Sequence, residues 1–430
     1  MNERADVERY DVLVCGAGPA GLAAAQAAAS GGARVGLIDA QASAGGQIWR
    51  RDVRHGDARI AARRIGRALR TPRVTFLSQS QVIAAGADEL LLEQAQGALR
   101  LRFGTLVIAT GARELLLPFP GWTLPGVTGA GGLQALVKQA WPIAGKRVVV
   151  AGTGPLLLAA AASLRRHGAH VLGIHEQASS RRVLGLAARL PAWPAHAVQA
   201  ILLRTALAGV AYRCGEFVVA AHGDDRLRAV EIHSPAGPRR LDCDHLAVGY
   251  GLVPNVELAQ LLGCRLEASA RHARVATDDA QRTSVANIYA AGEVCGIGGC
   301  AAARCEGQIA GLAAAGLLDA SRAQQARRRR ARRFAELLES CFALDERIRL
   351  LAKPDTVICR CEDLTMAALD GFADAREAKL ATRCGMGACQ GRICGASLAE
   401  LGRFAVGGMR PPLFPARLSS LCDPFAAIGP

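Results

Sequence analysis

The sequence predicts an α/β fold with two dinucleotide-binding units, the second inserted in the first, and a small cysteine-rich module near the C-terminal end. Three observations lead to this prediction. A Gly-x-Gly-x-x-Gly turn between a strand and a helix begins at Gly16, and a similar strand, turn and helix begin at Lys146. A group of cysteines follows after residue 354. Two such units in one chain are typical of Rossmann-like, doubly wound sheets.

In the first unit we expect strands at residues 11–15 and 34–39, with a helix at 21–30 between them. Gly16 permits the tight turn, Gly18 lets a pyrophosphate approach the backbone, and Gly21 lets helix and strand pack closely. The N–H groups at the helix start, beside Pro19 and Ala20, would hold the phosphates. A later strand is expected at residues 100–109.

The acidic residue Asp39 ends the second strand of this unit. A carboxylate about 20 residues after the first glycine is placed to bind the hydroxyl groups of a ribose. The complete strand–turn–helix–strand context makes this motif far more specific than an isolated glycine pattern.

The second unit departs from the pattern. We expect strands at residues 147–151 and 170–175 around a helix at 155–167, but the third glycine position is Leu157. A branched side chain there should push the helix away from the strand and disturb the phosphate-binding turn. Glu176 disfavours a 2′-phosphate, whereas Arg181 and Arg182 favour one. We therefore expect a degenerate nucleotide domain, followed by a small sheet at residues 227–232 and 240–246.

Composition and charge narrow the class of protein. The 430 residues are 51% hydrophobic and 4% aromatic, which suits two or three packed α/β domains. The net charge of +15 is concentrated at residues 50–73 and 327–333. Neither run contains the interleaved aromatic residues of a base-stacking surface. We expect solvated helix faces that attract anionic cofactors and acidic proteins, and no nucleic-acid partner.

The N-terminal residues 1–10 are polar and lead directly into a strand, so we expect no signal peptide. No apolar run reaches the roughly 18 residues that suggest a transmembrane segment. The sequence therefore predicts a cytoplasmic protein. In a reducing cytoplasm, its 14 cysteines are better explained as metal ligands, redox groups or buried thiols than as disulfides. We expect Cys295, Cys300 and Cys305 to be buried thiols.

The cysteine module contains Cys359-Arg-Cys361 and Cys389-Gln-Gly-Arg-Ile-Cys394. Cysteines at such spacings can share an iron, and a [2Fe–2S] cluster takes four thiolates. Cys384 and Cys389 are also separated by four residues, so spacing alone does not select the second pair. A zinc site with four cysteines is the structural alternative.

Further motifs identify a family resemblance. Gly45-Gly46-Gln47, Ala109-Thr110-Gly111 and Ala291-Gly292-Glu293 accompany the first turn, and residues 8–315 resemble the pyridine nucleotide-disulfide oxidoreductase superfamily. The resemblance implies FAD in the first domain. The implied contacts are Gly16, Gly18, Pro19, Ala20, Gly21, Asp39, Gly46, Gln47, Thr110, Gly111, Gly292 and Glu293. The superfamily usually has Asp at the position of Glu293, and its Cys-x-x-Cys dithiol is missing from this sequence.

A second resemblance concerns the remaining chain. The segments at 249–255, 359–363, 382–387 and 389–392 resemble flavoproteins with a bacterioferritin-associated-ferredoxin-like [2Fe–2S] module. These flavoproteins are components of hydrogen cyanide synthases (the B component), opine oxidases (the A component) and proline or hydroxyproline dehydrogenases (the alpha component). The resemblance implies that Cys359, Cys361, Cys389 and Cys394 bind the cluster, with Cys384 a bystander.

The resemblance also implies a role in electron transfer. The chain would relay electrons from an amino-acid-oxidase-like flavoprotein partner to a respiratory acceptor, at the inner face of the cell membrane through its complex. It leaves open the substrate of that complex and an FMN at the partner interface. No Ser/His/Asp or Cys/His arrangement is recognisable, so no catalytic residue is assigned. The alternatives are a self-contained NAD(P)H-dependent reductase that feeds its own cluster, and a non-catalytic cluster-bearing scaffold or nucleic-acid-binding protein without bound flavin.

These observations divide the chain into four parts. We expect an FAD-binding domain at 1–117 and 274–320, and a degenerate NAD(P)-binding-like domain at 118–273. An Arg-rich helical connector would span 321–353, and the [2Fe–2S] module with a proline-rich tail would span 354–430.

Overall fold

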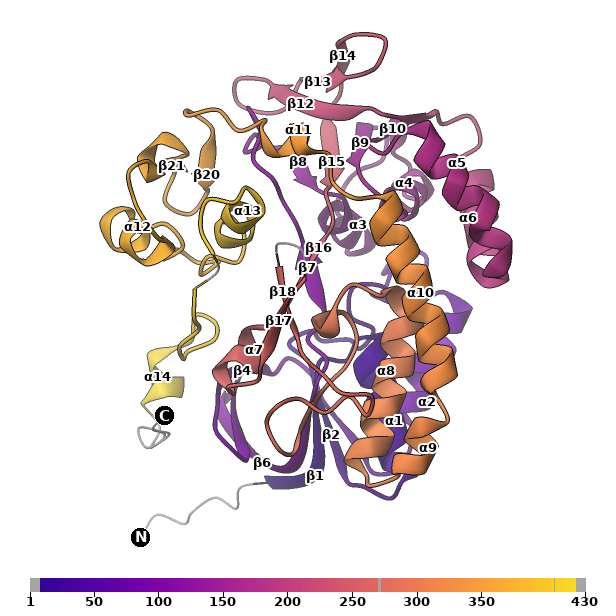
Figure 1. Cartoon of the computed structure of the whole chain (residues 1–430), viewed down its shortest axis with the longest axis vertical. Coiled ribbons are helices and arrows are strands. Elements are labelled where there is room, and N and C mark those ends of the chain that lie inside the picture. The colour runs from indigo at the N-terminus through magenta and orange to yellow at the C-terminus, as the bar shows by residue number, and fades with distance from the viewer. Residues whose placement is uncertain (1–7, 270–271, 406, 423–430) are drawn as a thin grey trace. The chain divides into compact units, whose positions relative to one another are not determined.

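The computed structural model describes residues 8–269, 272–405 and 407–422, and it divides into two compact units (Figure 1). Unit 1 comprises residues 1–113, 254–335 and 408–430, and unit 2 comprises 114–253 and 336–407. These two units group the residues differently from the four expected parts. Residues 254–269, 272–273 and 408–422 belong to unit 1, and Val256, Leu258 and Leu413 among them are buried in its core.

Unit 1 is built on a sheet that, within its described residues, has seven strands in the order β3-β2-β1-β6-β5-β4, with β19 also paired to β6. Its strands are β1 (Glu8–Cys15), β2 (Val35–Ile38), β3 (Val74–Leu77), β4 (Gln81–Ala85), β5 (Glu89–Gln94), β6 (Gly97–Ile108) and β19 (Ile288–Ala290). The neighbours β3, β2, β1 and β6 are parallel. The sequence therefore predicts β1, β2 and β6 correctly, with strand ends displaced by up to three residues, but it does not predict β3.

The remaining elements of unit 1 are helices and short strands. They are α1 (Pro19–Ser30), α2 (Arg59–Leu69), β7 (Ala112–Glu114), α7 (Glu257–Leu261), β17 (Leu266–Ser269), β18 (His272–Val275), the 3-10 turn η2 (Glu293–Cys295), α8 (Gly299–Ala314), α9 (Leu318–Arg322), α10 (Gln325–Cys341) and α14 (Leu418–Leu421). The helix α10 begins in unit 1 and its last residues belong to unit 2.

Helices α1 and α8 lie side by side in unit 1 (Figure 1) with their backbones almost in contact. A Cβ atom on Gly307 would lie 2.0 Å from the carbonyl oxygen of Ala20, and one on Gly311 would lie 2.2 Å from that of Ala24. Neither oxygen can move without unwinding α1. Glycine is therefore required at both positions of α8, and the surrounding interface consists of small buried alanines.

The tail crosses the edge of the same sheet. Leu413 is buried in the core of unit 1, and its N–H donates to the carbonyl oxygen of Ile83 in β4. Arg417 and the hydroxyl of Ser420 both bind the carboxylate of Glu93. The proline-rich tail is thus fixed by contacts with unit 1, while Pro424 and Pro430 lie outside the described residues.

Unit 2 repeats the topology of the first nucleotide unit. Its main sheet, within the described residues, has five strands in the order β11-β10-β9-β15-β8, all parallel. The elements are β8 (Val127–Gly129), α3 (Ala130–Lys138), β9 (Arg147–Gly152), α4 (Leu156–Arg166), β10 (His170–Glu176), α5 (Ser180–Arg189), η1 (Leu190–Ala192), α6 (Pro194–Ala206), β11 (Tyr212–Cys214), β15 (His245–Gly249) and β16 (Leu252–Pro254).

A small antiparallel sheet in unit 2 consists of β12 (Phe217–His222), β13 (Ala229–His233) and β14 (Arg239–Asp242). The expected strand 240–246 is divided between two sheets, because the chain turns after Asp242. Asp244 fixes this turn by accepting a hydrogen bond of 2.8 Å from the N–H of Arg147. The next strand, β15, then enters the centre of the parallel sheet.

The cysteine module ends unit 2. Helix α11 (Glu346–Arg349) precedes it, and the module contains β20 (Val357–Cys359), β21 (Leu364–Thr365), η3 (Ala367–Leu369), α12 (Ala375–Thr382) and α13 (Cys394–Glu400). Several hydrogen bonds attach it to the rest of unit 2. The indole N–H of Trp122 donates to the carbonyl of Val357 at 2.6 Å, and the Ser397 hydroxyl donates to that of Leu116 at 2.5 Å.

The α1–α8 contact leads to a prediction about stability. We expect Gly307→Ala to lower the free energy of unfolding of unit 1 by about 1–3 kcal/mol, because the added methyl group forces the two helices apart. Gly66→Ala on α2 is the matched control, since its Cβ would meet only the flexible end of Arg70. Urea denaturation followed by circular dichroism measures both. Equal stability of the two variants would contradict the close-packing account.

Candidate functional site: a nucleotide cradle and a thiol cluster

The first nucleotide turn has the geometry of a phosphate-binding cradle. Gly16 has φ +106°, and a Cβ on it would lie 2.3 Å from the carbonyl oxygen of Ala109. A Cβ on Gly21 would lie 1.7 Å from the carbonyl oxygen of Gly16. The N–H groups of Gly18, Ala20 and Gly21 have no acceptor within the described part of the chain. Free donors at the start of a helix are the expected partners of phosphate oxygens.

Asp39 stands beside this turn. Its Oδ2 atom accepts a hydrogen bond of 2.6 Å from the N–H of Ala17, and its Oδ1 atom accepts one of 2.8 Å from Gln41. The carboxylate is therefore held in one orientation. Each oxygen keeps a second lone pair, which suits the ribose contact predicted for it.

The loop after Asp39 closes over the turn. Gly45 donates to the carbonyl of Ala17 at 2.8 Å, and a Cβ on Gly46 would lie 2.9 Å from the Cα of Gly18. The Gln47 side chain accepts a hydrogen bond of 3.0 Å from Arg50. The backbones of Gly46 and Gly18 are thus in close contact.

Thr110 and Gly111 lie at the end of β6, where the structure adds a partner that the sequence motif did not identify. The side-chain amide of Asn255 donates to the carbonyl of Thr110 at 2.9 Å, and the Thr110 hydroxyl donates to the carbonyl of Asn255 at 2.7 Å. Arg113 donates to the side-chain oxygen of Asn255 at 2.8 Å. Asn255 therefore fixes the conformation of the Thr110–Gly111 loop.

Gly292 and Glu293 lie at the start of the turn that leads into α8. A Cβ on Gly292 would lie 2.7 Å from the Cβ of Ala20, which places this segment against the nucleotide turn. The Oε1 atom of Glu293 accepts from Gly299 at 2.7 Å, while its Oε2 atom is buried without a hydrogen-bond partner in the described residues. Burial raises the pKa of the Glu293 carboxyl above its ordinary value. An orphaned buried carboxyl oxygen indicates a polar ligand at this position.

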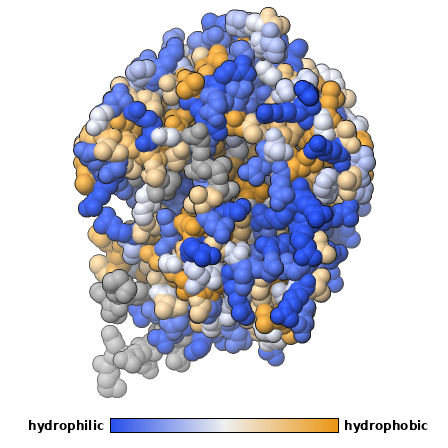
Figure 2. Space-filling view, in the orientation of Figure 1, coloured by the Kyte–Doolittle hydropathy of each residue, from blue (hydrophilic) through white to orange (hydrophobic). Residues whose placement is uncertain are grey.

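A buried ion pair supports this segment, although no sequence pattern indicates it. Glu306 of α8 is fully buried, accepts from Gly292 at 3.0 Å, and pairs with Arg332 of α10 at 2.6 Å. Arg328 also approaches Glu306, at 3.6 Å. The neighbouring arginines of α10 are exposed and contribute to the blue area over this helix in Figure 2. Two members of the arginine run therefore have a structural role, and the rest form a solvated face.

The second nucleotide turn resembles the first in its backbone conformation but differs in the N–H groups that it leaves available to a ligand. A Cβ on Gly152 would lie 1.9 Å from the carbonyl oxygen of Gly249. The N–H of Thr153 donates to that same oxygen at 2.7 Å, and the N–H of Gly154 donates to the Glu176 carboxylate at 2.7 Å. Leu157 is fully buried and packs against Gly249. Because Gly249 has no side chain, the Leu157 side chain has room there.

The chain itself fills the space over this second turn. The ring of Phe342 lies 3.7 Å from where a Cβ on Gly154 would be, and the Thr153 hydroxyl donates to the carbonyl of Phe342 at 3.0 Å. The Gln177 side chain donates to Ala343 at 3.1 Å and accepts from the N–H of Asp345 at 3.0 Å. Residues 342–345 therefore occupy the position at which a bound dinucleotide would place its pyrophosphate.

A cavity of about 390 Å³ remains beside this filled turn. Its lining includes Gln177, Arg182, His233, Asp345 and Arg347. Asp345 and Arg347 pair with each other at 2.8 Å, so the charges that would meet an anionic ligand are already partly neutralised. Buried His175 hydrogen-bonds to Glu216 at 2.7 Å, and His233 stacks on Phe217. These contacts give both histidines a structural role.

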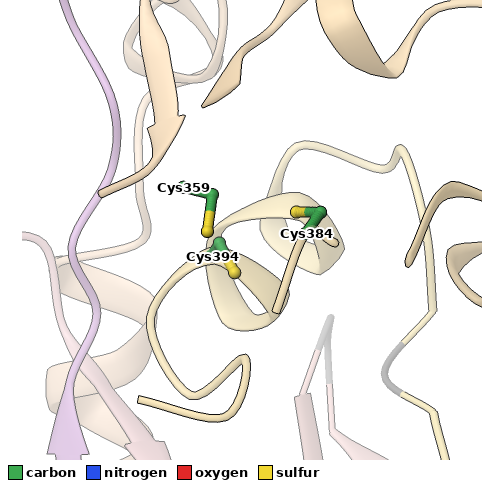
Figure 3. Close-up of side chains that lie close together, drawn as sticks. All are labelled: Cys359, Cys384 and Cys394. Carbon is green, nitrogen blue, oxygen red and sulfur yellow. The ribbon is translucent and has the colours of Figure 1, made fainter. Parts of the chain in front are cut away.

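In the cysteine module, the Sγ atoms of Cys359, Cys384 and Cys394 all lie within 4.8 Å of one another (Figure 3). Cys361 and Cys389 do not belong to this group of three close sulfurs. Hydrogen bonding from Cys394 lowers the pKa of Cys389 to about 4. The structure thus brings two of the four expected ligands, Cys359 and Cys394, together with Cys384, and the assignment of Cys361 and Cys389 stays a prediction.

The other thiols show no such grouping. Burial raises the pKa of Cys15 to about 12 and that of Cys300 to about 11, and it also raises the pKa of Cys295 and Cys305. Thiols that stay protonated are poor nucleophiles and poor metal ligands. Only the module at residues 359–394 gathers three or more cysteines among the described residues.

A parallel nucleotide-binding sheet with a free phosphate cradle, joined in one chain to a second unit of the same topology, defines the class of two-dinucleotide-fold oxidoreductases. Comparison with known proteins agrees. The profile of the pyridine nucleotide-disulphide oxidoreductase family matches residues 10–315. The chain belongs to this family, and it is a flavin-dependent oxidoreductase whose first domain is of the FAD-binding type.

Similar proteins cover nearly the whole chain. The A component of opine oxidase from Rhizobium meliloti is 34% identical, over 96% of this chain and 98% of that protein. The HcnB component of hydrogen cyanide synthase from Pseudomonas protegens is 32% identical, over 97% of each. The structure of L-proline dehydrogenase from P. horikoshii has the same fold, with a TM-score of 0.69 at 19% identity, over 98% of this chain and 82% of that one. No helix of the described residues has the length and apolarity needed to cross a membrane.

The close contact between Gly46 and Gly18 leads to a prediction about the flavin. We expect Gly46→Ala to be purified with about tenfold less FAD, because its methyl group would displace Gly18, whose N–H group is an expected phosphate donor. Gly56→Ala is the matched control, because Gly56 has a similar positive φ (+70° against +58°) but open space around it. Flavin absorbance per chain measures both. Full FAD content in Gly46→Ala would contradict the assignment of this loop.

The buried carboxyl of Glu176 leads to a prediction about pH. Burial raises its pKa from 4.5 to about 7, so the native state binds a proton that the unfolded state has lost between these values. The associated stabilisation is fully present below the unfolded pKa and is lost as pH rises through about 7. It amounts to at most about 3 kcal/mol.

We therefore expect unit 2 to unfold at a lower urea concentration at pH 8 than at pH 5. Glu176→Gln should remove most of this difference, although it weakens the hydrogen bonds to Gly154 and Ala178. An unchanged dependence on pH in the variant would assign the effect to another group.

Proposed function

We propose that this chain is the electron-relay component of a heteromeric dehydrogenase or oxidase that acts on amino or imino acids. FAD would bind at the cradle of unit 1 and a [2Fe–2S] cluster at the cysteine module. The observation that carries the proposal is the coexistence of one free nucleotide cradle and one cluster of thiols, while the second cradle is filled by residues 342–345.

The residues of the cradle fit FAD in kind and position. The N–H groups of Gly18, Ala20 and Gly21 would bind the pyrophosphate, Asp39 the ribose, and the orphaned Oε2 atom of Glu293 the ribityl chain. Glu293 is longer than the aspartate usual at this position. Its Oε1 atom is tied to Gly299, so the extra methylene serves to reach that N–H group.

The thiols of Cys359, Cys361, Cys389 and Cys394 would hold the iron–sulfur cluster. Bound FAD accepts electrons in pairs and releases them singly, which a one-electron cluster requires. The buried thiols elsewhere provide no dithiol chemistry, since their pKa values are raised. A zinc site would use the same ligands but would carry no electrons.

The names of the relatives support a partner. They are components of an opine oxidase and of hydrogen cyanide synthase, and the alpha component of sarcosine oxidase from Corynebacterium is 30% identical over 71% of this chain and 32% of that protein. We propose that an amino-acid-oxidase-like flavoprotein partner oxidises an opine, glycine, sarcosine or hydroxyproline-type substrate. The relay would deliver the electrons to a respiratory acceptor on the inner face of the cell membrane. An FMN at the partner interface is compatible with this arrangement.

The alternative function is an NAD(P)H-dependent reductase that feeds its own cluster. It requires a pyridine nucleotide in unit 2. There, the N–H groups of Thr153 and Gly154 are already bound to protein acceptors, and Phe342 packs over the turn. These contacts favour the relay.

The proposal predicts the spectrum of the purified chain under anaerobic conditions. We expect flavin absorption, with about two irons and two acid-labile sulfides per chain. Dithionite should reduce both cofactors, whereas NADH and NADPH should leave the flavin oxidised, because residues 342–345 block the second cradle. Zinc in place of iron, or a folded chain without flavin, would overturn the relay. Rapid bleaching by NADH would favour the reductase instead.

A further inference from the structure

Helix α6 of unit 2 has an apolar face that is exposed. All residues of α6 are described, and none of them is buried. Val198, Ile201 and Leu202 are exposed large aliphatic side chains, and Ile201 and Leu202 are each 64% accessible. Because residues three and four positions apart lie on the same side of a helix, these three side chains form one surface. The outer face of a surface helix is normally polar.

The opposite side of α6 packs on its own unit. His196, Ala200 and Leu203 lie on that side and are partly buried. Leu207, directly after the helix, is fully buried in a core of unit 2. The inner side therefore accounts for the packing of α6 within unit 2, and the outer aliphatic side chains take no part in it.

The segment that contains α6 carries positive charge without negative charge. Between Glu176 and Glu216 the sequence has no Asp or Glu. Arg181 and Arg189 of α5 and Arg204 of α6 are exposed. The helices α5 and α6 follow one another through η1, and Figure 1 shows both at the outer edge of unit 2. The apolar face of α6 thus belongs to a basic surface.

Charge and composition select the partner that fits this surface. A second copy of the chain would bring its arginines against those of the first, and like charges repel. Protein interfaces are centred on Trp, Tyr and Arg, whereas Leu and Val are under-represented there. A helix that lies at a lipid surface combines aliphatic side chains with neighbouring arginines. The partly exposed Trp193, directly before α6, suits the boundary between lipid and water.

We propose that the outer face of α6, with α5 beside it, binds the surface of an anionic lipid bilayer. Val198, Ile201 and Leu202 would enter the boundary between headgroups and acyl chains, and the exposed arginines would meet lipid phosphates. The helix would lie in the plane of the membrane. The inference deepens the proposed function, because it brings the relay to the membrane that holds its electron acceptor. Binding to lipid requires neither flavin nor iron, so the two proposals fail separately.

The test measures flotation of the purified full chain with vesicles of equal parts phosphatidylglycerol and phosphatidylcholine. Leu202→Gln should bind about tenfold more weakly, because it removes one apolar side chain from the lipid and keeps a good helix former. Arg189→Gln should bind about fivefold more weakly, because it removes one charge near the anionic surface. Circular dichroism verifies that each variant is folded.

Leu350→Gln is the matched control, because Leu350 is 80% exposed in unit 2 but lies outside α5 and α6. It should bind the vesicles as the wild-type chain does. Equal binding by Leu202→Gln and Leu350→Gln would overturn the inference, and so would a wild-type chain that does not bind these vesicles. Self-association that Leu202→Gln abolishes, without vesicle binding, would assign the face to a second copy instead. A chain that binds vesicles but contains neither flavin nor iron would refute only the proposed function.

Discussion

The contact between the backbones of α1 and α8 is the constraint on which the FAD-binding unit depends. Helix α1 begins at the nucleotide turn, and α8 begins just after Glu293. Because Gly307 and Gly311 have no side chains, α8 rests directly on the carbonyl oxygens of α1. The orphaned carboxyl oxygen of Glu293 and the free N–H groups of the turn are consequently held by one rigid pair of helices.

The buried ion pair of Glu306 and Arg332 also stabilises unit 1. Glu306 accepts from the N–H of Gly292, and Arg332 also donates to the carbonyl of Gly296 at 3.0 Å. Removing one partner of a buried ion pair leaves an uncompensated charge, which typically costs about 3–5 kcal/mol. Arg328 and Arg332 of α10 therefore stabilise the interior of unit 1, so these two arginines do not belong to a surface that binds an acidic ligand.

Two copies of one nucleotide-binding topology have different properties in this chain. In unit 1, the N–H groups of Gly18, Ala20 and Gly21 in the nucleotide turn have no acceptor among the described residues. In unit 2, Glu176 and the carbonyl of Gly249 take up the donors, and Phe342 covers the turn. A chain with one free cradle cannot pass electrons between two bound dinucleotides. The iron–sulfur cluster proposed at the thiols of the C-terminal module would be a different acceptor, and this difference supports the proposed relay over a reductase.

Local sequence patterns predict much of this structure, but they do not predict its long-range contacts. The glycines of the first turn, Asp39 and the parallel strands follow from spacing within about thirty residues. Other contacts join residues much farther apart in the sequence. Asn255 is hydrogen-bonded to Thr110, and Arg332 is paired with Glu306. Phe342 packs against Gly154. No periodicity marks these partners, because each is selected by the tertiary fold. Cys384 is an intermediate case. Its sequence spacing makes it a possible ligand, but only the structure shows that its Sγ atom lies within 4.8 Å of those of Cys359 and Cys394.

The central claim is that flavin and cluster exchange electrons within one chain. The direct measurement is light-driven reduction of the anaerobic protein with a deazaflavin sensitiser, followed by time-resolved flavin absorbance and by rapid-freeze electron paramagnetic resonance of the cluster. The account predicts that flavin reoxidation and cluster reduction proceed with one rate constant that is independent of protein concentration. A flavin that stays reduced beside an oxidised cluster, or a rate proportional to protein concentration, would contradict it.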